Sequence, residues 1–425
     1  MLLRVPLVKA LRGSVILPAS KSYSIRAFFV AACGGVSRVI GPSDCDDAIV
    51  AGKVAEAFGA RVVPVSGGYR IVALTDVDRR AALKIDVRES GTSLRFVLPL
   101  LSFFCSSAQV TGRGTLLGRP NHHLCLALRD RGLKVQGAGA QESVPVIFSG
   151  GELPGGRIVI DGSVSSQFIS ALMIAAPFCR QDTRLVMSGQ LVSRDYVLMT
   201  RQILARAGIR VIEKSPREFL IPGKQKYKGL KSFHVPSDWG LAAFFMVAAA
   251  LVPSAITLKG CFDDTLVQSD GAILGFLSRM GLKYSRSPRA LKIKGAQELK
   301  GGVFSLKDCP DLVPIMAVAA MFAKGPTRLK DIGHARVKES DRISDLRHEL
   351  LKVGADIREK HDEMVIVPQA SYRSGVTLDP HHDHRLAMAF AVLGLRIGVK
   401  ISDIECTKKS YPGFVKALSA VTLKL

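Results

Sequence analysis

Two cationic side chains and several hydroxyl groups are clustered near the start of the chain, in the segment LPASKSYSIRAFF. Lys21, Ser22 and Arg26 lie within about one turn of one another if a helix begins here. Hydroxyl donors beside two cations have the chemistry of a phosphate-binding site. The alternative is a capped helix with solvated basic side chains, and the segment alone does not decide between them.

A second group of donors precedes another apolar run, in the segment IDGSVSSQF. Ser165, Ser166 and Gln167 offer hydroxyl and amide donors able to hold a phosphate or a carboxylate. An ordinary N-cap serine at the start of a helix gives the same pattern.

The segment HARVKESDRISDL combines two cations with an acid. Lys338 and Arg342 are four residues apart, so a helix would place both on one face, with Glu339 three residues before Arg342. Like charges on one face cost stability unless an anion lies over them, which indicates an anion site. A solvated charged helix is the alternative.

Three histidines occupy the segment DPHHDHRLAMAF, just ahead of an apolar run. His381, His382 and His384 are of a type that binds zinc, but no pair stands at i,i+4 and no HExxH motif is present. We therefore expect no metal site. Arg385, which enters the apolar run, indicates anion binding instead.

Arg119 in LLGRPNHHL and the pair Lys408 and Lys409 in ECTKKSYPGF add cations on expected loops. The chain has no GxxxxGK[ST], no GxGxxG after a strand and no GxSxG. The common nucleotide-binding and hydrolase sites are therefore not supported.

The overall charge favours anionic partners, since 59 Lys and Arg against 36 Asp and Glu give a net charge of +23. Nucleic acid and small phosphorylated substrates both fit this charge. Aromatic residues make up only 6%, and the basic residues are scattered rather than interleaved with stacking side chains. We expect small anions and no nucleic acid.

Length and apolar content indicate a globular protein of two domains, since 425 residues exceed the size of one hydrophobic core. The 8 cysteines form no CxxC pair, which favours reduced thiols in the cytoplasm. The first 20 residues are interrupted by basic side chains, unlike a signal peptide. The longest apolar stretch, 242–252, is too short to cross a bilayer, so we expect no membrane association.

A repeat positions these motifs. Five amphipathic segments end in a glycine followed by an alternating strand, and successive glycines are 73, 76, 73 and 73 residues apart. A short strand with a turn recurs six times with nearly the same period, and so does a run that is apolar on all sides. These runs predict six buried helices. The glycines are Gly59, Gly132, Gly208, Gly281 and Gly354.

A polar segment stands directly before each of the six apolar runs, where N-caps belong. The six segments read SKSYS, ESGTS, SVSSQ, PSDWG, DCPD and HHDH. A helix N-terminus carries about half a positive charge, so several ends that meet would attract anions. We expect an α/β fold with two similar lobes, each of three repeated units around buried helices, and a last unit truncated by the chain end.

Taken in order, these motifs resemble the EPSP synthase family of enolpyruvyl transferases over nearly the whole chain. The matching strings are PASKSYSIRA, SGTSLR, LGRPNHHL, DGSVSSQF, RVKESDR, DHRLAM and KKSYPGF. The resemblance implies two lobes of three βαβαββ units each, with the first lobe at 19–235 and the second at 1–18 plus 236–425. The substrates would lie between lobes that close over them.

The resemblance also implies a reaction. The 5-hydroxyl of shikimate 3-phosphate would add to C2 of phosphoenolpyruvate while C3 is protonated, and phosphate would then leave, without a metal or organic cofactor, in aromatic amino acid (chorismate) biosynthesis. The enzyme would be a cytoplasmic monomer. The cell-wall relative that uses UDP-N-acetylglucosamine is disfavoured, because the loop TGRGTLLGRP lacks its cysteine. An RNA-binding protein on a related repeat fold is the rival from another class.

The resemblance assigns roles by matching position. The catalytic residues would be Lys21, Asp311, Glu339 and His384, with Asp311 receiving the 5-hydroxyl proton. Shikimate 3-phosphate would be bound by Lys21, Ser22, Arg26, Ser165, Ser166, Gln167, Ser193, Tyr196, Asp311, His334 and Lys338. Phosphoenolpyruvate would be bound by Lys21, Gly91, Arg119, Gln167, Arg342, Arg385 and Lys409.

Three positions depart from the family pattern. Glu89 and His334 stand where Asn is frequent, and Phe96 stands where Pro is frequent. Glu89 adds a negative charge beside an expected anion site. Gly91 matches the glycine of glyphosate-sensitive members, so the resemblance implies a glyphosate target.

Overall fold

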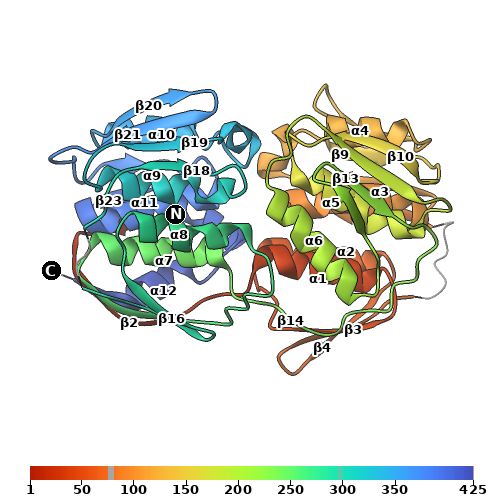
Figure 1. The fold of residues 1–425 in the computed structure, drawn as a ribbon, viewed down its shortest axis with the longest axis horizontal. Coiled ribbons are helices and arrows are strands. Elements are labelled where there is room, and N and C mark those ends of the chain that lie inside the picture. Colours follow the sequence, from red (N-terminus) through yellow and green to blue (C-terminus); the bar gives the residue numbers. More distant parts are fainter. Residues whose placement is uncertain (75–80, 296–297, 425) are drawn as a thin grey trace. The chain divides into compact units, whose positions relative to one another are not determined.

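The computed structural model describes residues 1–74, 81–295 and 298–424. The chain divides into two compact units, each with its own core (Figure 1). We call Ala19–Val235 lobe I, and Met1–Pro18 with Pro236–Leu425 lobe II. Lobe I is thus one continuous stretch, inserted after the first 18 residues of lobe II.

Three repeats follow the chain without interruption. In each, two parallel strands flank a buried helix, and a second helix leads to an antiparallel hairpin whose last strand pairs with the second parallel strand. One comprises β6 (Ala82–Asp86), α3 (Gly91–Phe104), β7 (Ser107–Thr111), α4 (His122–Arg129), β8 (Val135–Ala138) and β9 (Ser143–Phe148). The next comprises β10 (Gly156–Asp161), α5 (Ser166–Ala175), β11 (Thr183–Ser188), α6 (Arg194–Arg206), β12 (Ile212–Ser215) and β13 (Glu218–Ile221). The third, in lobe II, comprises β18 (Val303–Ser305), α9 (Val313–Met321), β19 (Thr327–Lys330), α10 (Ser344–Lys352), β20 (Asp356–Lys360) and β21 (Glu363–Val367).

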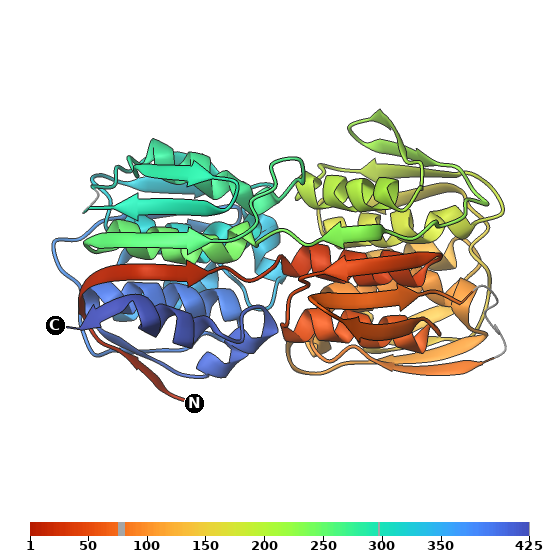
Figure 2. The ribbon, with the colours of Figure 1, turned by 90° about the horizontal axis from the view of Figure 1, so that it is seen from below.

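Two further repeats take their first strand from a distant part of the chain. In lobe I, β14 (Lys231–His234) pairs in parallel with β3, and in lobe II, β2 (Val8–Ile16) pairs in parallel with β15 (Figure 2). The lobe I repeat continues through α1 (Lys21–Ala32), β3 (Val36–Ile40), α2 (Asp46–Ala57), β4 (Arg61–Val65) and β5 (Gly68–Val72). The lobe II repeat continues through α7 (Trp239–Leu251), β15 (Ser254–Lys259), α8 (Ala272–Arg279), β16 (Tyr284–Ser287) and β17 (Ala290–Lys294).

The last repeat is truncated, and the N-terminus takes part in its sheet. β1 (Leu3–Val5) pairs antiparallel with the second strand of this repeat, where the earlier repeats place a strand of the hairpin. The repeat comprises β22 (Thr377–Leu378), α11 (His384–Ile397), β23 (Val399–Ile401) and α12 (Phe414–Val421), and β24 (Thr422–Lys424) pairs with β2. The expected α/β fold of repeated units is confirmed.

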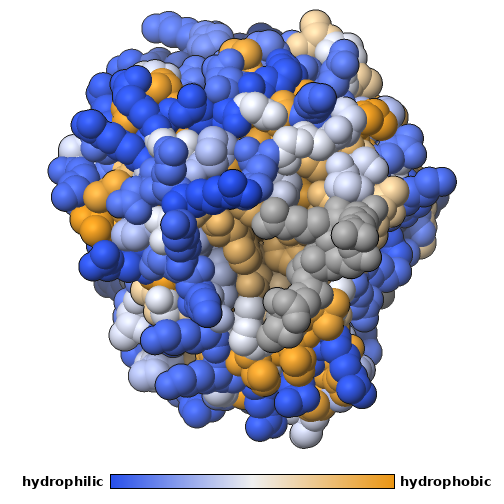
Figure 3. Space-filling view, turned by 90° about the vertical axis from the view of Figure 1, so that its right-hand side faces the viewer, coloured by the Kyte–Doolittle hydropathy of each residue, from blue (hydrophilic) through white to orange (hydrophobic). Residues whose placement is uncertain are grey.

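The buried helices form the centre of each lobe. In α7 every residue from Trp239 to Leu251 is buried, as its unbroken apolar sequence predicts, and α7, α9 and α11 pack against one another. In lobe I, α3 packs on both α5 and α1. No helix among the described residues is long and apolar enough to cross a bilayer. On the face shown in Figure 3, hydrophilic residues predominate and hydrophobic ones are scattered.

Five of the six expected side-chain caps are present. Polar side chains accept a backbone N–H in the first turns of α1, α3, α5, α7 and α11, from Ser20, Ser90, Ser165, Asp238 and Asp383. The prediction for DCPD was wrong, because α9 follows a 3₁₀ turn and its N-cap residue Leu312 has no polar side chain. The Asp311 carboxylate is instead bonded to arginines.

The five repeat glycines have positive φ angles, between 81° and 104°, as the helix-ending pattern predicts. At Gly354, which follows α10, φ is +88° and a Cβ would meet no atom within 4 Å. The glycine is therefore required there by backbone conformation and not by lack of space.

We expect opposite effects from alanine at two open glycines of lobe II. Gly354→Ala puts a Cβ on left-handed backbone and should cost about 1 kcal/mol, whereas Gly275→Ala, inside α8 and equally open, should gain up to about 1 kcal/mol. The measurement is the melting temperature of each variant. Equal shifts of the same sign would contradict the assignment of Gly354 as a conformational requirement.

Candidate active site

The candidate residues form two groups, one in each lobe. Lobe I contributes Lys21, Ser22, Arg26, Gly91, Arg119, Ser165, Ser166, Gln167, Ser193 and Tyr196. Lobe II contributes Asp311, His334, Lys338, Glu339, Arg342, His384, Arg385 and Lys409.

A buried guanidinium is the centre of the lobe II group. Arg342 is 1% exposed, and its Nε, Nη1 and Nη2 donate to Asp383 Oδ2 at 2.7 Å, Asp311 Oδ1 at 2.7 Å and Glu339 Oε2 at 2.9 Å. Burial alone would lower the pKa of Arg342, but these three carboxylates outweigh burial and raise it. Arg342 is therefore a permanent cation that ties together the η4 turn (Pro310–Leu312), the loop after the η5 turn (Gly333–Val337) and the start of α11.

Arg385 shares the Asp311 carboxylate with Arg342. Its Nη2 lies 3.1 Å from Asp311 Oδ2 and 3.8 Å from Asp270 Oδ2. Gly240, at the start of α7, leaves the space for this arrangement, since a Cβ there would lie 2.2 Å from Asp270 Oδ2 and 2.7 Å from Arg385 Nη1. The N-terminal ends of α7, α9 and α11 thus meet within lobe II, as expected for this lobe.

The two carboxylates beside Arg385 have opposite pKa shifts. Burial would raise the pKa of Asp311, but Arg385, Arg342 and Lys338 outweigh it and hold that pKa well below its usual range. Burial, reinforced by the Asp311 and Asp238 carboxylates and opposed by Arg385 and Arg342, raises the pKa of Asp270 to about 7. Asp311 is thus ionised, whereas Asp270 titrates near neutrality.

The segment that carries Lys338 and Glu339 is not helical, contrary to the prediction. The η5 turn (Gly333–Val337) ends before Lys338, and α10 begins at Ser344. Glu339 and Arg342 meet nevertheless, because the intervening turns fold the chain back, and Lys409 Nζ lies 3.6 Å from Glu339 Oε1. The spacing that suggested a helix face instead suits a loop held by ion pairs.

His334 lies in the η5 turn beside this loop. Its side chain is 9% exposed, and Nε2 has no hydrogen-bond partner among the described residues. Burial first and the Lys338 charge second lower the pKa of His334 to about 3, so the ring is neutral at physiological pH.

The three neighbouring histidines lie near different acids. His381 Nε2 is 3.3 Å from Glu349 Oε1, and His382 Nδ1 is 2.6 Å from Asp403 Oδ2. His384 is 1% exposed, with Nδ1 3.9 Å from Asp383 Oδ1. No cluster of metal-ligand type is found among His, Cys, Asp and Glu in the described part of the chain.

In lobe I, Arg26 of α1 is buried against α6, a helix of another repeat. Its Nε donates to Thr200 Oγ1 at 2.8 Å, Nη1 to the Ser22 carbonyl and Nη2 to the Tyr196 carbonyl. Burial lowers the pKa of Arg26 to about 10, so the side chain remains charged at neutral pH. The guanidinium lies 5.4 Å from the ring of Phe96, so this departure from the family pattern adds a cation–π contact.

Lys21 is the first residue of α1 and lies 3.1 Å from Asp47 Oδ2, on α2. Ser193 has a left-handed backbone (φ 53°) that only a few per cent of non-glycine residues adopt, and its buried Oγ has no partner within the described chain. Strain combined with an unsatisfied buried hydroxyl is typical of a ligand-binding position.

The N-terminal ends of α3 and α5 meet in lobe I. The Gln167 side chain, at the start of α5, bonds Arg95 and Thr92 on α3, at 2.6 Å and 3.0 Å. Gly91 opens α3, and a Cβ there would lie 2.7 Å from Arg119 Nη1 and 2.9 Å from Arg95 Nη1. Two guanidinium groups therefore lie directly over Gly91.

Glu89 lies under a neighbouring loop. A Cβ on Gly114, whose φ is +59°, would come within 2.6 to 2.8 Å of the Glu89 carboxyl group. This close approach places the carboxylate against the start of the η1 turn (Gly114–Gly118) that leads to Arg119.

Sequence reasoning missed three buried residues that complete these groups, namely Asp270, Arg95 and Asp47. None of these three residues lies in a segment whose residue spacing indicated a binding or catalytic site. Arg95 did carry a signal, since an arginine inside the all-apolar run LRFVLPLLSFF must find partners when the helix is buried.

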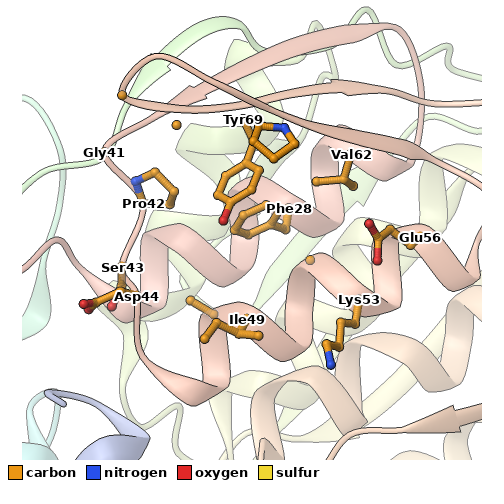
Figure 4. Close-up of a pocket in the computed structure, with 15 residues that line it drawn as sticks. Phe28, Gly41, Pro42, Ser43, Asp44, Ile49, Lys53, Glu56, Val62 and Tyr69 are labelled. Carbon is orange, nitrogen blue, oxygen red and sulfur yellow. The ribbon is translucent and has the colours of Figure 1, made fainter.

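A cavity of about 480 Å³ in lobe I lies apart from the candidate residues (Figure 4). Phe28 and Tyr69 line it, with ring centroids 5.6 Å apart, together with Ile49 and Lys53 of α2. None of its 15 lining residues is a candidate site residue.

Asp270 should make stability depend on pH. Its pKa is about 7 in the folded protein and about 3.9 in an unfolded chain, so between these values the folded state binds an extra proton and the free energy of unfolding falls as pH rises. Asp270→Asn removes this contribution. Between about pH 5 and pH 8, we expect wild type to lose on the order of 2 kcal/mol more stability than the variant.

The measurement is denaturant unfolding at both pH values, with Asp264→Asn as the control, since the Asp264 side chain is 75% exposed. The same pH dependence in wild type and Asp270→Asn would contradict the assignment.

Comparison with known proteins places this geometry in a family. The family model for EPSP synthase (3-phosphoshikimate 1-carboxyvinyltransferase) matches residues 6–418. The 3-phosphoshikimate 1-carboxyvinyltransferase of Methanosarcina acetivorans is 34% identical over 430 residues, with 100% of this chain and 99% of the relative covered. That of Methanocella arvoryzae is 35% identical over 417 residues, with 97% of each covered.

A solved EPSP synthase structure from Acinetobacter baumannii is 26% identical, with a TM-score of 0.79 and 100% of this chain and 98% of that chain covered. Because the family model spans almost every repeat and the relatives match from end to end, the chain belongs to the EPSP synthase family.

Proposed function

We propose that both groups of residues act on one pair of substrates, in the transfer of the enolpyruvyl group of phosphoenolpyruvate to the 5-hydroxyl of shikimate 3-phosphate. This transfer, with release of phosphate, is the activity of the family to which the chain belongs. The observation that carries the proposal for the residues is the buried cluster of Arg342 and Arg385 around the Asp311 carboxylate. Such a cluster offers fixed cations for an anionic substrate beside a carboxylate for proton transfer.

The proposed binding residues follow the charges of the two substrates. Phosphoenolpyruvate is bound by Lys21, Gly91, Arg119, Gln167, Arg342, Arg385 and Lys409. Shikimate 3-phosphate is bound by Lys21, Ser22, Arg26, Ser165, Ser166, Gln167, Ser193, Tyr196, Asp311, His334 and Lys338. Two of these assignments are supported by Ser193 Oγ and His334 Nε2, which are buried polar atoms that lack a hydrogen-bond partner in the described chain.

In the addition step, the 5-hydroxyl oxygen forms a bond to C2 of phosphoenolpyruvate as its proton passes to Asp311. The double-bond electrons take up a proton at C3, supplied from the set of Lys21, Glu339 and His384. In the elimination step, the C2–O bond to phosphate breaks, a proton leaves C3 and the enol double bond returns. The reaction needs no change of oxidation state.

Without substrate, the Asp311 carboxylate is bonded to Arg342 and Arg385, and the Glu339 carboxylate is bonded to Arg342. Arg342 and Arg385 hold the pKa of Asp311 far below that of a useful base. A bound phosphoenolpyruvate anion competes for both guanidiniums and adds negative charge nearby, so the pKa of Asp311 rises when this substrate arrives. The base is thereby activated only in the complex that can react.

We propose that the protein acts on these two small molecules as a cytoplasmic monomer, without nucleic acid, membrane, metal or organic cofactor. The test is phosphate release from purified protein given shikimate 3-phosphate and phosphoenolpyruvate, with EDTA present. We expect release that requires both substrates and survives EDTA. Release with UDP-N-acetylglucosamine as the acceptor, or none with shikimate 3-phosphate from folded protein, would overturn the proposal.

Gly91→Ala should weaken phosphoenolpyruvate selectively. Its Cβ displaces the guanidinium of Arg119, the nearest side-chain end, whereas Arg95 is held in place by three hydrogen bonds. We expect an unchanged melting temperature, a KM for phosphoenolpyruvate raised about tenfold, which is about 1.4 kcal/mol, and a smaller change in KM for shikimate 3-phosphate.

The same variant should be less sensitive to glyphosate, which inhibits the wild-type enzyme when phosphoenolpyruvate is low. Gly118→Ala, at a glycine whose Cβ would meet no atom within 4 Å, is the control. Equal effects of Gly91→Ala on both KM values would contradict the placement of phosphoenolpyruvate over Gly91.

Asp311→Asn should lower kcat by about 100-fold or more, because proton acceptance is lost while the shape is kept. The activity that remains in Asp311→Asn should no longer depend on the ionisation of this carboxyl group. The measurement is kcat and KM for both substrates across pH. An Asp311→Asn enzyme with wild-type kcat would remove Asp311 from the proton-transfer role.

A further inference from the structure

Arg95 is an arginine inside the buried helix α3, among side chains that are otherwise almost all apolar. It is 3% exposed, and its guanidinium lies 5.5 Å from the ring of Phe168, on α5. A charged group in such a position is stable only when its donors are bound.

The donors of Arg95 are bound to groups at the candidate site. Nη1 donates to Gln167 Oε1 at 2.6 Å, Nε donates to Asn121 Oδ1 at 3.1 Å and Nη2 donates to the Pro120 carbonyl at 3.1 Å. The last two bonds hold the chain directly after Arg119, and Asn121 Nδ2 in turn donates to the Arg119 carbonyl at 3.2 Å. The guanidinium thus spans from α5 to the loop that carries Arg119.

The bond to Gln167 selects one orientation of its amide. A guanidinium has only donors, so the atom that faces it must be the carbonyl oxygen of Gln167. The amide nitrogen then points the other way, where it donates to Thr92 Oγ1 at 3.0 Å. If the amide were rotated by half a turn, an N–H of Gln167 would face the N–H of Arg95, and buried donors would lose their acceptor.

We propose that Arg95 is a positioning residue that fixes the amide orientation of Gln167, so that the Gln167 nitrogen is presented as a hydrogen-bond donor to the substrates. This inference rests on the proposed function, in which Gln167 contacts both substrates. Arg95 itself does not need to touch either substrate, because it acts through the glutamine. The cation fixes one orientation of a side chain that could otherwise present its oxygen or its nitrogen.

The position of Gly91 supports an Arg95 that acts through Gln167 and does not touch the substrates. A Cβ at Gly91 would lie 2.9 Å from Arg95 Nη1 and 2.7 Å from Arg119 Nη1, so both guanidiniums lie next to the same glycine. All three guanidinium nitrogens of Arg95 donate to protein oxygens. Arg95 is thus built into the wall of the site.

The test is a double-mutant cycle on the full-length enzyme with Arg95→Lys, Gln167→Ala and both changes together. Arg95→Lys keeps the charge and loses the planar fork, so we expect kcat/KM for phosphoenolpyruvate to fall about tenfold or more in the wild-type background. In the Gln167→Ala background the same change should cost less than about threefold, because no amide is left to orient.

Gln167→Glu provides a second test that does not depend on changing Arg95. Glutamate keeps an oxygen for Arg95 and replaces the donor nitrogen by another acceptor, so a role in orienting a donor predicts a loss in kcat/KM as large as that of Gln167→Ala. If the substrates needed no donor from residue 167, Gln167→Glu would form an ion pair with Arg95 and retain activity, and that result would overturn the proposal.

Arg201→Lys is the control, since the Arg201 guanidinium also donates to a side-chain oxygen in lobe I, Glu213 Oε2 at 2.8 Å, outside the candidate site. Its effect on kcat/KM should be small and additive with Gln167→Ala. Melting temperatures show that each variant is folded. If wild type is active and the losses of Arg95→Lys and Gln167→Ala are additive, the positioning role is refuted and the proposed function is not. A folded wild type that releases no phosphate would refute the proposed function.

Discussion

A guanidinium held at 1% exposure depends on the carboxylates around it, and this constraint organises lobe II. Arg342 needs Asp383, Asp311 and Glu339 to remain charged in the interior, and these three acids come from three separate segments of the chain. The resulting ion-pair cluster fixes the segments to one another without a helix or sheet between them. Loss of any partner would leave a buried charge uncompensated, so the binding group and the local fold are stabilised by the same contacts.

The repeat could be predicted from the sequence because its signals are local. A glycine after an amphipathic helix needs left-handed backbone, and a run such as 241–251 that is apolar on every side must be buried, so both features are visible in a short window. Gly354 and α7 are where these signals predicted them. The caps of five buried helices followed from the same local chemistry.

The parts that escaped prediction depend on partners far away in the chain. The sequence suggests that Asp311 caps a helix, but its carboxylate accepts hydrogen bonds from Arg342 and Arg385 instead. The raised pKa of Asp270 arises from its burial beside Asp311. The pairings of β2 with β15 and of β14 with β3 join strands that are more than 190 residues apart in the chain. No window of the sequence contains these contacts.

The pairing of β2 with β15 also constrains how the protein is made. Residues 1–18 leave the ribosome before lobe I, yet β1 and β2 find their partners only in strands that begin at Ser254 and later. Lobe I is a continuous segment and can be completed as soon as its residue Val235 has emerged. During that interval the backbone groups on both edges of β2 lack their strand partners, so β2 is open to pairing with another chain until β15 and β24 have been made.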